Sequence, residues 1–100
     1  MVREGGIELF VFEEAGQITG FIGIDQGFIE GLFVKKNNQK QGIGKCLMQQ
    51  AKKSYKNLSL KVYAKNENAI AFYKNQGFQI VSQGNDENTG EKEFLMTFTC

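Results

Sequence analysis

The amino-acid sequence predicts one α/β domain over residues 1–100, with a mixed, mostly antiparallel central sheet and the element order β-β-β-α-β-α-β-β. Three apolar, β-rich runs separated by short turns open the chain, two later segments have the apolar spacing of helices, and two further apolar runs close the chain. The strand–helix–strand unit in the middle favours a parallel strand pair, whereas the runs at each end favour antiparallel hairpins.

Three strands are expected at the start of the chain. Residues 7–12 and 18–25 are rich in Ile, Val and Phe, and the segment 13–17 between them contains a glycine typical of a turn. A third strand is expected over residues 28–35. Gly31 within it indicates a β-bulge or the close approach of another backbone.

An amphipathic helix is expected to begin at Ile43, after a polar loop over residues 37–41. Residues 58–64 form the next expected strand, because apolar side chains alternate along it. The apolar positions that indicate the helix are Ile43, Leu47, Met48, Ala51 and Tyr55.

A second, shorter helix is expected next, with Asn66 or Asn68 as its N-cap and Gly77 at its C-terminal end. Residues 78–83 and 93–99 are the last two expected strands, and a turn-rich loop joins them. The closing part of the chain is therefore expected to be an antiparallel hairpin.

Composition excludes several classes of function. The chain has 12 basic and 11 acidic side chains, a net charge of +1, so a nucleic-acid-binding surface is not expected. Histidine, the commonest metal ligand and general base, does not occur in the sequence, and we expect no metal site. Cys46 and Cys100 do not form a disulfide framework. Neither a signal peptide nor a membrane span is apparent, so we expect a cytoplasmic protein with no membrane partner.

Gly42 and Gly44 stand at the start of the first expected helix, where glycine is otherwise unfavourable. The first N–H groups of a helix have no internal partners and lie at the positive end of its dipole, so an anion can approach bare backbone there. Lys40 and Lys45 add positive charge, and the pattern indicates a pyrophosphate site. Leu47 stands where the dinucleotide fingerprint needs its third glycine, and the nucleoside-triphosphate loop does not fit either. A glycine pair that only tightens a turn is the alternative.

Two segments resemble the signatures of the GNAT superfamily of N-acetyltransferases. Residues 39–44, QKQGIG, are similar to the family motif Q/R-x-x-G-x-G/A, and residues 66–78, NENAIAFYKNQGF, are similar to N-x-x-A-x-x-x-Y followed by G-F. The resemblance covers residues 7–100 and implies a sheet that splays into a V between residues 28–35 and 58–64. It also implies a short form of the fold, because the family's usual N-terminal strand and two helices have no counterpart before residue 7.

The resemblance implies that acetyl-CoA is the donor substrate. The backbone of Leu32, Phe33 and Val34 is expected to pair with the pantetheine arm, and Asn66 is expected to help hold that arm. A helix N-cap is the alternative for Asn66, and the two roles are compatible. The residues implied to hold the pyrophosphate are Gln39, Lys40, Gln41, Gly42, Ile43, Gly44 and Lys45.

The same resemblance implies two catalytic side chains. Tyr73 matches the family tyrosine that donates a proton to the CoA sulfur, and the alternative is an aromatic residue on an apolar helix face. Glu30 is the candidate general base, acting through water, and the alternative is a solvent-facing charge with bulk water as the base. The oxyanion donor is expected to be the backbone N–H of Leu32 or Phe33. Cys46 is interpreted as a packing residue rather than a nucleophile, because no histidine is available to activate it.

The implied activity is the direct transfer of an acetyl group from acetyl-CoA to a primary amine in a ternary complex. The amine belongs to a small molecule or to a protein. The alternative is a non-catalytic module that senses acetyl-CoA or stabilises a partner. Tyr73 and Asn66 favour the enzyme, whereas the missing acceptor-side helices favour the module. One face of the sheet would be left uncovered without these helices, so we expect a homodimer.

Overall fold

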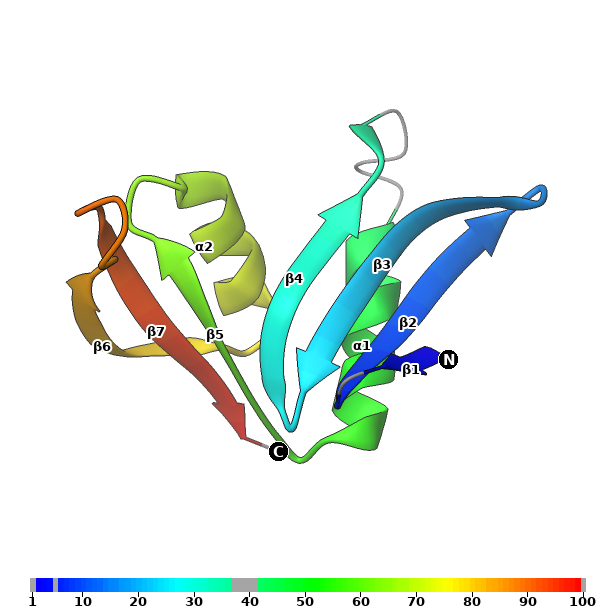
Figure 1. The fold of residues 1–100 in the computed structure, drawn as a ribbon, viewed down its shortest axis with the longest axis horizontal. Coiled ribbons are helices and arrows are strands. Elements are labelled where there is room, and N and C mark those ends of the chain that lie inside the picture. Colours follow the sequence, from blue (N-terminus) through cyan, green and yellow to red (C-terminus); the bar gives the residue numbers. More distant parts are fainter. Residues whose placement is uncertain (1, 5, 37–41, 100) are drawn as a thin grey trace.

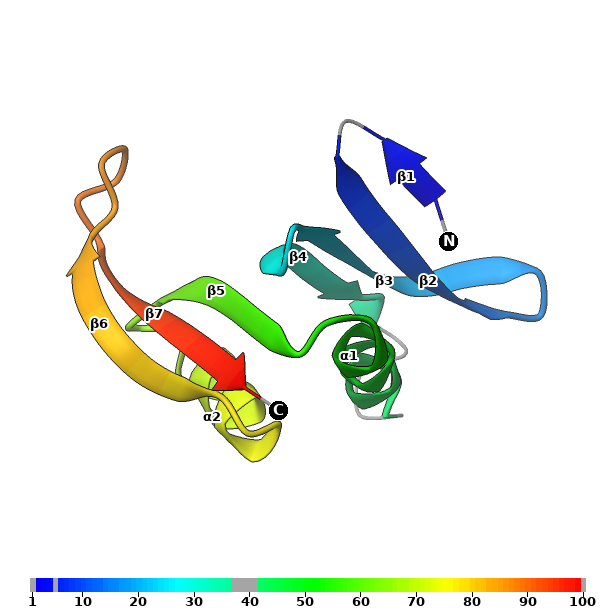
Figure 2. The same cartoon turned by 90° about the horizontal axis from the view of Figure 1, so that it is seen from below.

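The sheet opens into a V between two groups of strands (Figure 1). The computed structural model describes residues 2–4, 6–36 and 42–99. Its seven strands follow the order β1-β2-β3-β4-β5-β7-β6, with α1 beside the first group and α2 beside the second (Figure 2). No helix in the described ranges is long and apolar enough to cross a membrane. The elements are β1 (Val2–Glu4), β2 (Ile7–Glu14), β3 (Gln17–Asp25), β4 (Phe28–Val34), α1 (Ile43–Ser54), β5 (Asn57–Tyr63), α2 (Glu67–Asn75), β6 (Gln79–Asn85) and β7 (Lys92–Thr99).

The predicted order of elements is confirmed from β2 onward, and β1 is an addition to it. β1 pairs antiparallel with the start of β2, where Val2 lies opposite Leu9 and Glu4 lies opposite Ile7. A run of three residues is too short to show a periodicity in the sequence. The predicted parallel pair is also confirmed, between β4 and β5, while the other strand pairs are antiparallel.

An extra residue in β4 interrupts its pairing with β3. Ile24 lies opposite Ile29, but its neighbour Gly23 lies opposite Gly31, so Glu30 is the inserted residue of a β-bulge. The glycine that indicated a bulge in the sequence therefore lies directly beside it.

The bulge decides which side chains of β4 face the interior. Without an inserted residue, the face that holds Ile29 would continue with Phe33, because side chains alternate along a strand. The insertion shifts this alternation by one residue. Leu32, which lies opposite the buried Ile22, and Val34 therefore continue the face of Ile29, and Phe33 points to the other side.

The hydrophobic core lies on the face of the sheet that α1 covers and continues under β5 and β7. Residues from both groups of strands contribute to it, so the core spans the base of the V. Burial of one such side chain contributes about 1.5–3 kcal/mol to folding. The largest fully buried side chains are Ile22, Ile24, Met48, Leu58, Leu60 and Met96.

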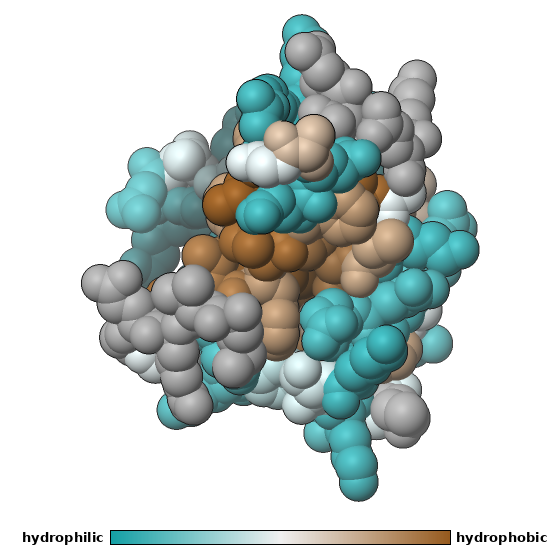
Figure 3. All heavy atoms as spheres, turned by 90° about the vertical axis from the view of Figure 1, so that its right-hand side faces the viewer, coloured by the Kyte–Doolittle hydropathy of each residue, from teal (hydrophilic) through white to brown (hydrophobic). Residues whose placement is uncertain are grey.

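The opposite face of the β2–β4 sheet carries exposed hydrophobic side chains. Val11, Phe21 and Phe33 lie side by side across the three strands. Their exposed fractions are 40%, 37% and 52%, and the rings of Phe21 and Phe33 stack with centroids 5.6 Å apart. Hydrophobic side chains also gather in a hollow on the side of the molecule where β1 and β2 lie (Figure 3). The row of Val11, Phe21 and Phe33 is therefore a continuous apolar surface rather than a set of isolated exposed side chains.

β4 and β5 meet at the base of the V and then separate. Phe28 lies opposite Ser59 in the one register position that pairs the two strands. The N–H of Ser59 donates to the carbonyl of Gly27 at 2.9 Å. The edge of β4 beyond Phe28 is consequently not paired with β5, which confirms the splay that the resemblance implied.

β6 is the outer strand of the second group. It pairs antiparallel with β7, which in turn pairs with β5 along its whole length. All residues of β6 are exposed, and the register shifts at Val81. α2 and the core therefore lie against β5 and β7 rather than against this edge.

Deletion of Glu30 is expected to lower the free energy of unfolding by about 2–4 kcal/mol. Without the inserted residue, β4 must turn either Ile29 or the pair Leu32 and Val34 away from the core. Urea unfolding measures the change. Glu30→Ala is the matched control: it keeps the inserted residue, and because Glu30 is exposed its effect is expected to stay within about 0.5 kcal/mol. Similar losses for both variants would contradict the role of the bulge.

Candidate functional site

The N-terminus of α1 presents backbone N–H groups without a capping side chain. Gly42, the N-cap residue, has φ of 77°, in the left-handed region that favours glycine. Its carbonyl accepts the N–H of Cys46 at 3.0 Å, which is the first hydrogen bond of the helix. The N–H groups of Ile43, Gly44 and Lys45 therefore have no acceptor within α1. The first turn of α1 contains no acidic residue. This end of the helix is therefore positive and suits an anion.

Gly44 allows α2 to approach the start of α1. A Cβ at Gly44 would lie 3.3 Å from Cζ of Phe72, tighter than most contacts of real Cβ atoms, and 3.8 Å from Cγ2 of Val34. A side chain here would push Phe72 away. Gly42 is thus needed for its backbone conformation, and Gly44 is needed for the packing of one helix against the other.

β4 supplies one wall of the site with both side chains and backbone. The N–H of Lys35 donates to the carbonyl of Thr19 at 2.7 Å, so the backbone groups of Lys35 point toward β3. Backbone groups alternate in direction along a strand, and those of Phe33 therefore also point toward β3. The N–H and C=O of Leu32 therefore point to the other edge of β4, beyond the position where β5 pairs. An extended polar ligand can hydrogen-bond along this edge.

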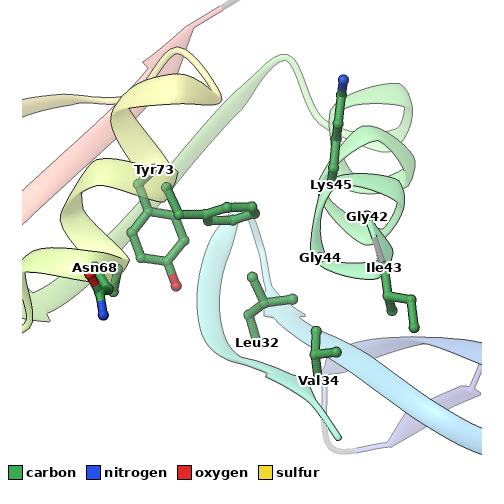
Figure 4. A pocket seen from close by; sticks show the side chains of 10 residues that line it. Leu32, Val34, Gly42, Ile43, Gly44, Lys45, Asn68 and Tyr73 are labelled. Atoms are coloured by element: carbon green, nitrogen blue, oxygen red, sulfur yellow. The ribbon is translucent and has the colours of Figure 1, made fainter. Parts of the chain in front are cut away.

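A pocket of about 770 Å³ lies between β4, the start of α1 and one face of α2 (Figure 4). Its volume falls within the range of roughly 300–1,000 Å³ that is usual for small-molecule sites. The helix N-terminus lies on one side and the hydroxyl of Tyr73 on the other. The lining residues are Leu32, Val34, Gly42, Ile43, Gly44, Lys45, Asn68, Ala69, Phe72 and Tyr73.

Tyr73 directs its hydroxyl into the space between α2 and β4 (Figure 4). Burial raises the pKa of the Tyr73 phenol above its ordinary value of 10.0, because the phenolate would lose solvation. The hydroxyl is therefore protonated throughout the neutral range. It can donate a hydrogen bond or a proton to a group that becomes negative in the pocket.

The C-terminal end of α2 holds Tyr73 in place. The carbonyl of Tyr73 accepts the N–H of Phe78, and the carbonyl of Lys74 accepts the N–H of Gly77, both at 3.0 Å. This pair of bonds is a Schellman motif, and Gly77 takes its usual left-handed conformation with φ of 94°. The rings of Tyr73 and Phe78 pack with centroids 5.8 Å apart. The G-F pair of the second signature therefore fixes the backbone and the ring of Tyr73.

Predicted residues from three separate segments of the chain come together in this pocket. They belong to β4, to the start of α1 and to α2, and the pocket is the place where these segments converge. Gln39, Lys40 and Gln41 lie outside the described residues. The predicted residues that line the pocket are Leu32, Val34, Gly42, Ile43, Gly44, Lys45 and Tyr73.

Asn66 begins α2 and does not line the pocket. Its Oδ1 accepts the N–H of Ala69 at 3.2 Å, which confirms the N-cap interpretation, while a role in holding the cofactor arm stays a prediction. Asn68, Ala69 and Phe72 line the pocket and were missing from the sequence prediction. Ala69 precedes Tyr73 by four residues and Asn68 precedes Phe72 by four, so helical periodicity is the signal that identifies them.

Glu30 and Phe33 also lie outside the pocket lining. Glu30 is exposed at the bulge, and the ring of Phe33 stacks on Phe21 on the other face of the sheet. The backbone of Phe33 is directed toward β3, whereas that of Leu32 is directed toward the open edge. Of the two predicted oxyanion donors, the geometry therefore favours Leu32.

Cys46 is exposed, which corrects its interpretation as a packing residue. At about 100° per residue, its position falls outside the arc that α1 buries. It borders a smaller pocket of about 410 Å³ between α1 and β2. Within the described part of the chain, no group of His, Cys, Asp or Glu is placed to hold a metal ion. The buried positions of α1 are Ile43, Leu47, Met48 and Ala51.

Sequence comparisons match this chain to one protein family and to relatives with named activities. A family model described as acetyltransferase (GNAT) domain matches residues 1–99. The peptidyl-lysine N-acetyltransferase YiaC of Escherichia coli K12 is 39% identical over 90 residues, which cover 89% of this chain and 62% of YiaC. The peptidyl-lysine N-acetyltransferase YjaB of the same organism is 27% identical over 78 residues, which cover 78% of this chain and 53% of YjaB. The chain therefore spans between half and two thirds of the length of these relatives.

Solved structures share the fold. A Bacillus anthracis structure, described as a candidate streptothricin acetyltransferase in complex with acetyl coenzyme A, has a TM-score of 0.87 at 23% identity. The match covers 99% of this chain and 65% of that protein. The solution structure of apo-form YjaB from Escherichia coli has a TM-score of 0.81 at 25% identity, and the match covers 90% of this chain and 63% of YjaB.

The Tyr73→Phe variant is expected to lose less stability than the wild type when the pH becomes alkaline. The pKa of Tyr73 in the folded state is raised above 10.0. The contribution of the neutral, buried phenol is therefore fully present below about pH 10 and is lost as the pH rises through the folded pKa. Chemical unfolding of both proteins between about pH 8 and pH 11 measures the difference. The pKa of Tyr63 is also raised, by its hydrogen bond to Asp86, but Tyr63 is present in both proteins and its effect cancels. Parallel pH profiles would contradict the burial of Tyr73.

Proposed function

Because the chain belongs to the acetyltransferase (GNAT) domain family, we propose that it moves the acetyl group of acetyl-CoA to a primary amine. The observation that carries the proposal is the pocket that joins the N-terminus of α1 to Tyr73 along the edge of β4. An anion site, a strand edge and a proton donor thus line one space. These three elements together suit a thioester that carries a pyrophosphate.

The start of α1 holds the pyrophosphate in this proposal. The N–H groups of Ile43, Gly44 and Lys45 donate to its oxygens, and Gly42 leaves room for it because none of the described residues lies within 4 Å of a Cβ placed there. Residues 39–41, which lie outside the described residues, stay predicted partners of the same group. The pantetheine arm, whose amides are polar and extended, lies along the edge of β4 at Leu32.

The chemistry is a direct transfer in a ternary complex. The neutral amine attacks the thioester carbon, the carbonyl oxygen becomes negative, and the Leu32 N–H stabilises it. The C–S bond then breaks as the amide forms. The Tyr73 hydroxyl gives its proton to the departing thiolate and recovers one from solvent. Before the attack, Glu30, exposed on the bulge of β4, takes one proton from the protonated amine through a water molecule, and the amine nitrogen gives its second proton to solvent as the amide forms.

A lysine side chain of a protein is the acceptor that we propose. The support is YiaC, a peptidyl-lysine N-acetyltransferase that is 39% identical to this chain. A lysine amine has an ordinary pKa of about 10.4 and is protonated at neutral pH, so a base has to act before the attack. This requirement is the reason for assigning the role of base to Glu30, the acidic residue on the bulge of β4.

A homodimer in the cytoplasm is proposed as the state in which the protein works. The row of Val11, Phe21 and Phe33 offers an apolar surface on one face of the sheet, and a second copy of the chain can cover it. Cys46 is a free thiol on the surface, as suits a reducing compartment. The same row supports a second candidate function, a module that binds acetyl-CoA and stabilises a different partner chain without turnover.

Tyr73→Phe is expected to lower kcat about a hundredfold and to leave the acetyl-CoA affinity nearly unchanged, because the ring and its packing remain and only the hydroxyl is lost. Release of free CoA in the presence of lysine-containing peptides measures turnover, and calorimetry measures affinity. Tyr63→Phe is the matched control, since Tyr63 donates to Asp86 away from the pocket. Turnover that is unaffected by Tyr73→Phe would remove the proton donor from the mechanism. Tight acetyl-CoA binding with no acetylation across a broad panel of amines would favour the non-catalytic module.

Val11→Lys is expected to convert the dimer into a monomer of 11.2 kDa, because a charge at the β2 end of the apolar row must be desolvated on association. Sedimentation at micromolar concentration measures the state. Gln49→Lys adds the same charge at an exposed position on α1 and is expected to leave the dimer intact. A monomeric wild-type protein would contradict the proposed assembly.

A further inference from the structure

A side chain of α1 reaches across the base of the V to the second group of elements. Lys52 lies in the last turn of α1, which packs against β2, β3 and β4. Its Nζ donates to the carbonyl of Gln76 at 2.5 Å and lies 4.5 Å from the centre of the Phe98 ring. Gln76 is the C-cap of α2, and Phe98 belongs to β7. Lys52 therefore links α1 with α2, which carries Tyr73, and with β7.

Both contacts favour a cation at this place. The carbonyl of Gln76 lies at the C-terminal end of α2, which is the negative end of the helix dipole. The face of an aromatic ring such as Phe98 is also negative. Lys52 is half-buried, so water screens these interactions less than it does at a fully exposed site.

The contacts of Lys52 continue directly to Tyr73. The ring of Phe98 packs on Phe78 with centroids 5.7 Å apart, and Phe78 packs on Tyr73 at 5.8 Å. Gln76 belongs to the Schellman motif that ends α2, in which the carbonyl of Tyr73 accepts the N–H of Phe78. Lys52 thus touches the ring cluster and the backbone motif that hold Tyr73.

α1 touches the second group of elements at both of its ends, and the pocket lies beside its first end. Phe72 lies against Gly44 at the N-terminal end, and Lys52 reaches Gln76 and Phe98 from the last turn. Figure 4 shows the two helices on opposite sides of the pocket. The distance between α1 and α2 is therefore also the width of the pocket.

We propose that Lys52 is a positioning residue, which sets the distance between the anion-binding end of α1 and the hydroxyl of Tyr73. It touches neither the pocket nor the ligand, and it acts through the position of α2. When this link is missing, α2 is held less firmly. A ligand that has to contact both helices then binds more weakly, because part of its binding free energy is used to order them. A ligand that contacts α1 alone is unaffected. The inference rests on the proposed acetyl-CoA site, but not on turnover.

Binding of two ligands to Lys52→Met tests the proposal. Acetyl-CoA spans the pocket from α1 to Tyr73, whereas its fragment 3′-phospho-ADP carries the pyrophosphate for α1 and lacks the arm that reaches α2. Calorimetry is expected to show a loss of roughly tenfold for acetyl-CoA, the size of one lost cation–π contact and hydrogen bond, and a loss below about twofold for the fragment. Equal losses for both ligands, or no loss for either, would overturn the proposal.

Three further variants separate positioning from general stability. Lys53→Met is the matched control, because Lys53 is the exposed neighbour of Lys52 on the same helix, and it is expected to bind both ligands as the wild type does. Lys52→Arg keeps the charge and the donors and is expected to restore most of the acetyl-CoA affinity. Lys52→Gln keeps a donor for Gln76 without the charge, and an intermediate affinity is expected. If Lys52→Met does not fold, the comparison of Lys52→Arg with Lys52→Gln decides: equal acetyl-CoA affinities in these two variants would contradict the role of the charge.

Kinetics distinguish this proposal from the proposed function. If the wild type acetylates peptides, Lys52→Met is expected to lower kcat as well as acetyl-CoA affinity, because Tyr73 is no longer held at its place, while KM for the peptide stays within about twofold. A change in the peptide KM alone, with kcat and acetyl-CoA affinity unaffected, would contradict the positioning role of Lys52. If the wild type binds acetyl-CoA but acetylates no amine, the catalytic function fails, and the two-ligand experiment still decides the role of Lys52.

Discussion

The separation of β4 from β5 after one register position is the constraint on which the site depends. If the two strands paired along their whole length, the backbone groups of Leu32 would bond to β5 and no ligand could use them. Buried backbone groups need partners, so the edge of β4 at Leu32, which is not paired with β5, suits an extended polar ligand. The bulge at Glu30 completes the arrangement, because it turns Leu32 and Val34 toward the pocket and Phe33 away from it.

α1 carries the two features that give the pocket its shape. Its first turn has bare backbone and no acidic side chain, and its last turn contains Lys52. A helix of 12 residues is about 18 Å long and rigid over that distance. The bare N–H groups and the contacts of Lys52 with α2 are therefore held by one rigid helix, so we expect changes at either end of α1 to alter the same pocket.

The sequence was sufficient to predict the elements from β2 to β7 and the bare backbone at the start of α1, because each depends on a pattern within one segment. Bare N–H groups at a helix start, for example, follow from Gly42 alone. Asn68 and Phe72 were missed as lining residues, because the helical periodicity that identifies them applies only once the face of α2 that turns toward β4 is known. The side chain of Asn66 caps its own helix, a local role that the motif does not separate from ligand binding. The exposure of Cys46, by contrast, was predictable, because the helical period places it outside the arc that α1 buries.

The V also divides the chain into two nearly contiguous stretches. β1 to α1 occupy residues 2–54, and β5 to β7 occupy residues 57–99. Apart from Phe28 opposite Ser59, each stretch forms its strand pairs with its own strands. Contacts close in sequence cost little loop-closure entropy, so each stretch can act as a cooperative unit that forms early and docks afterwards. The divergence that makes room for a ligand thus also keeps the strand pairs of each stretch local in sequence, and the pocket lies where the two stretches meet.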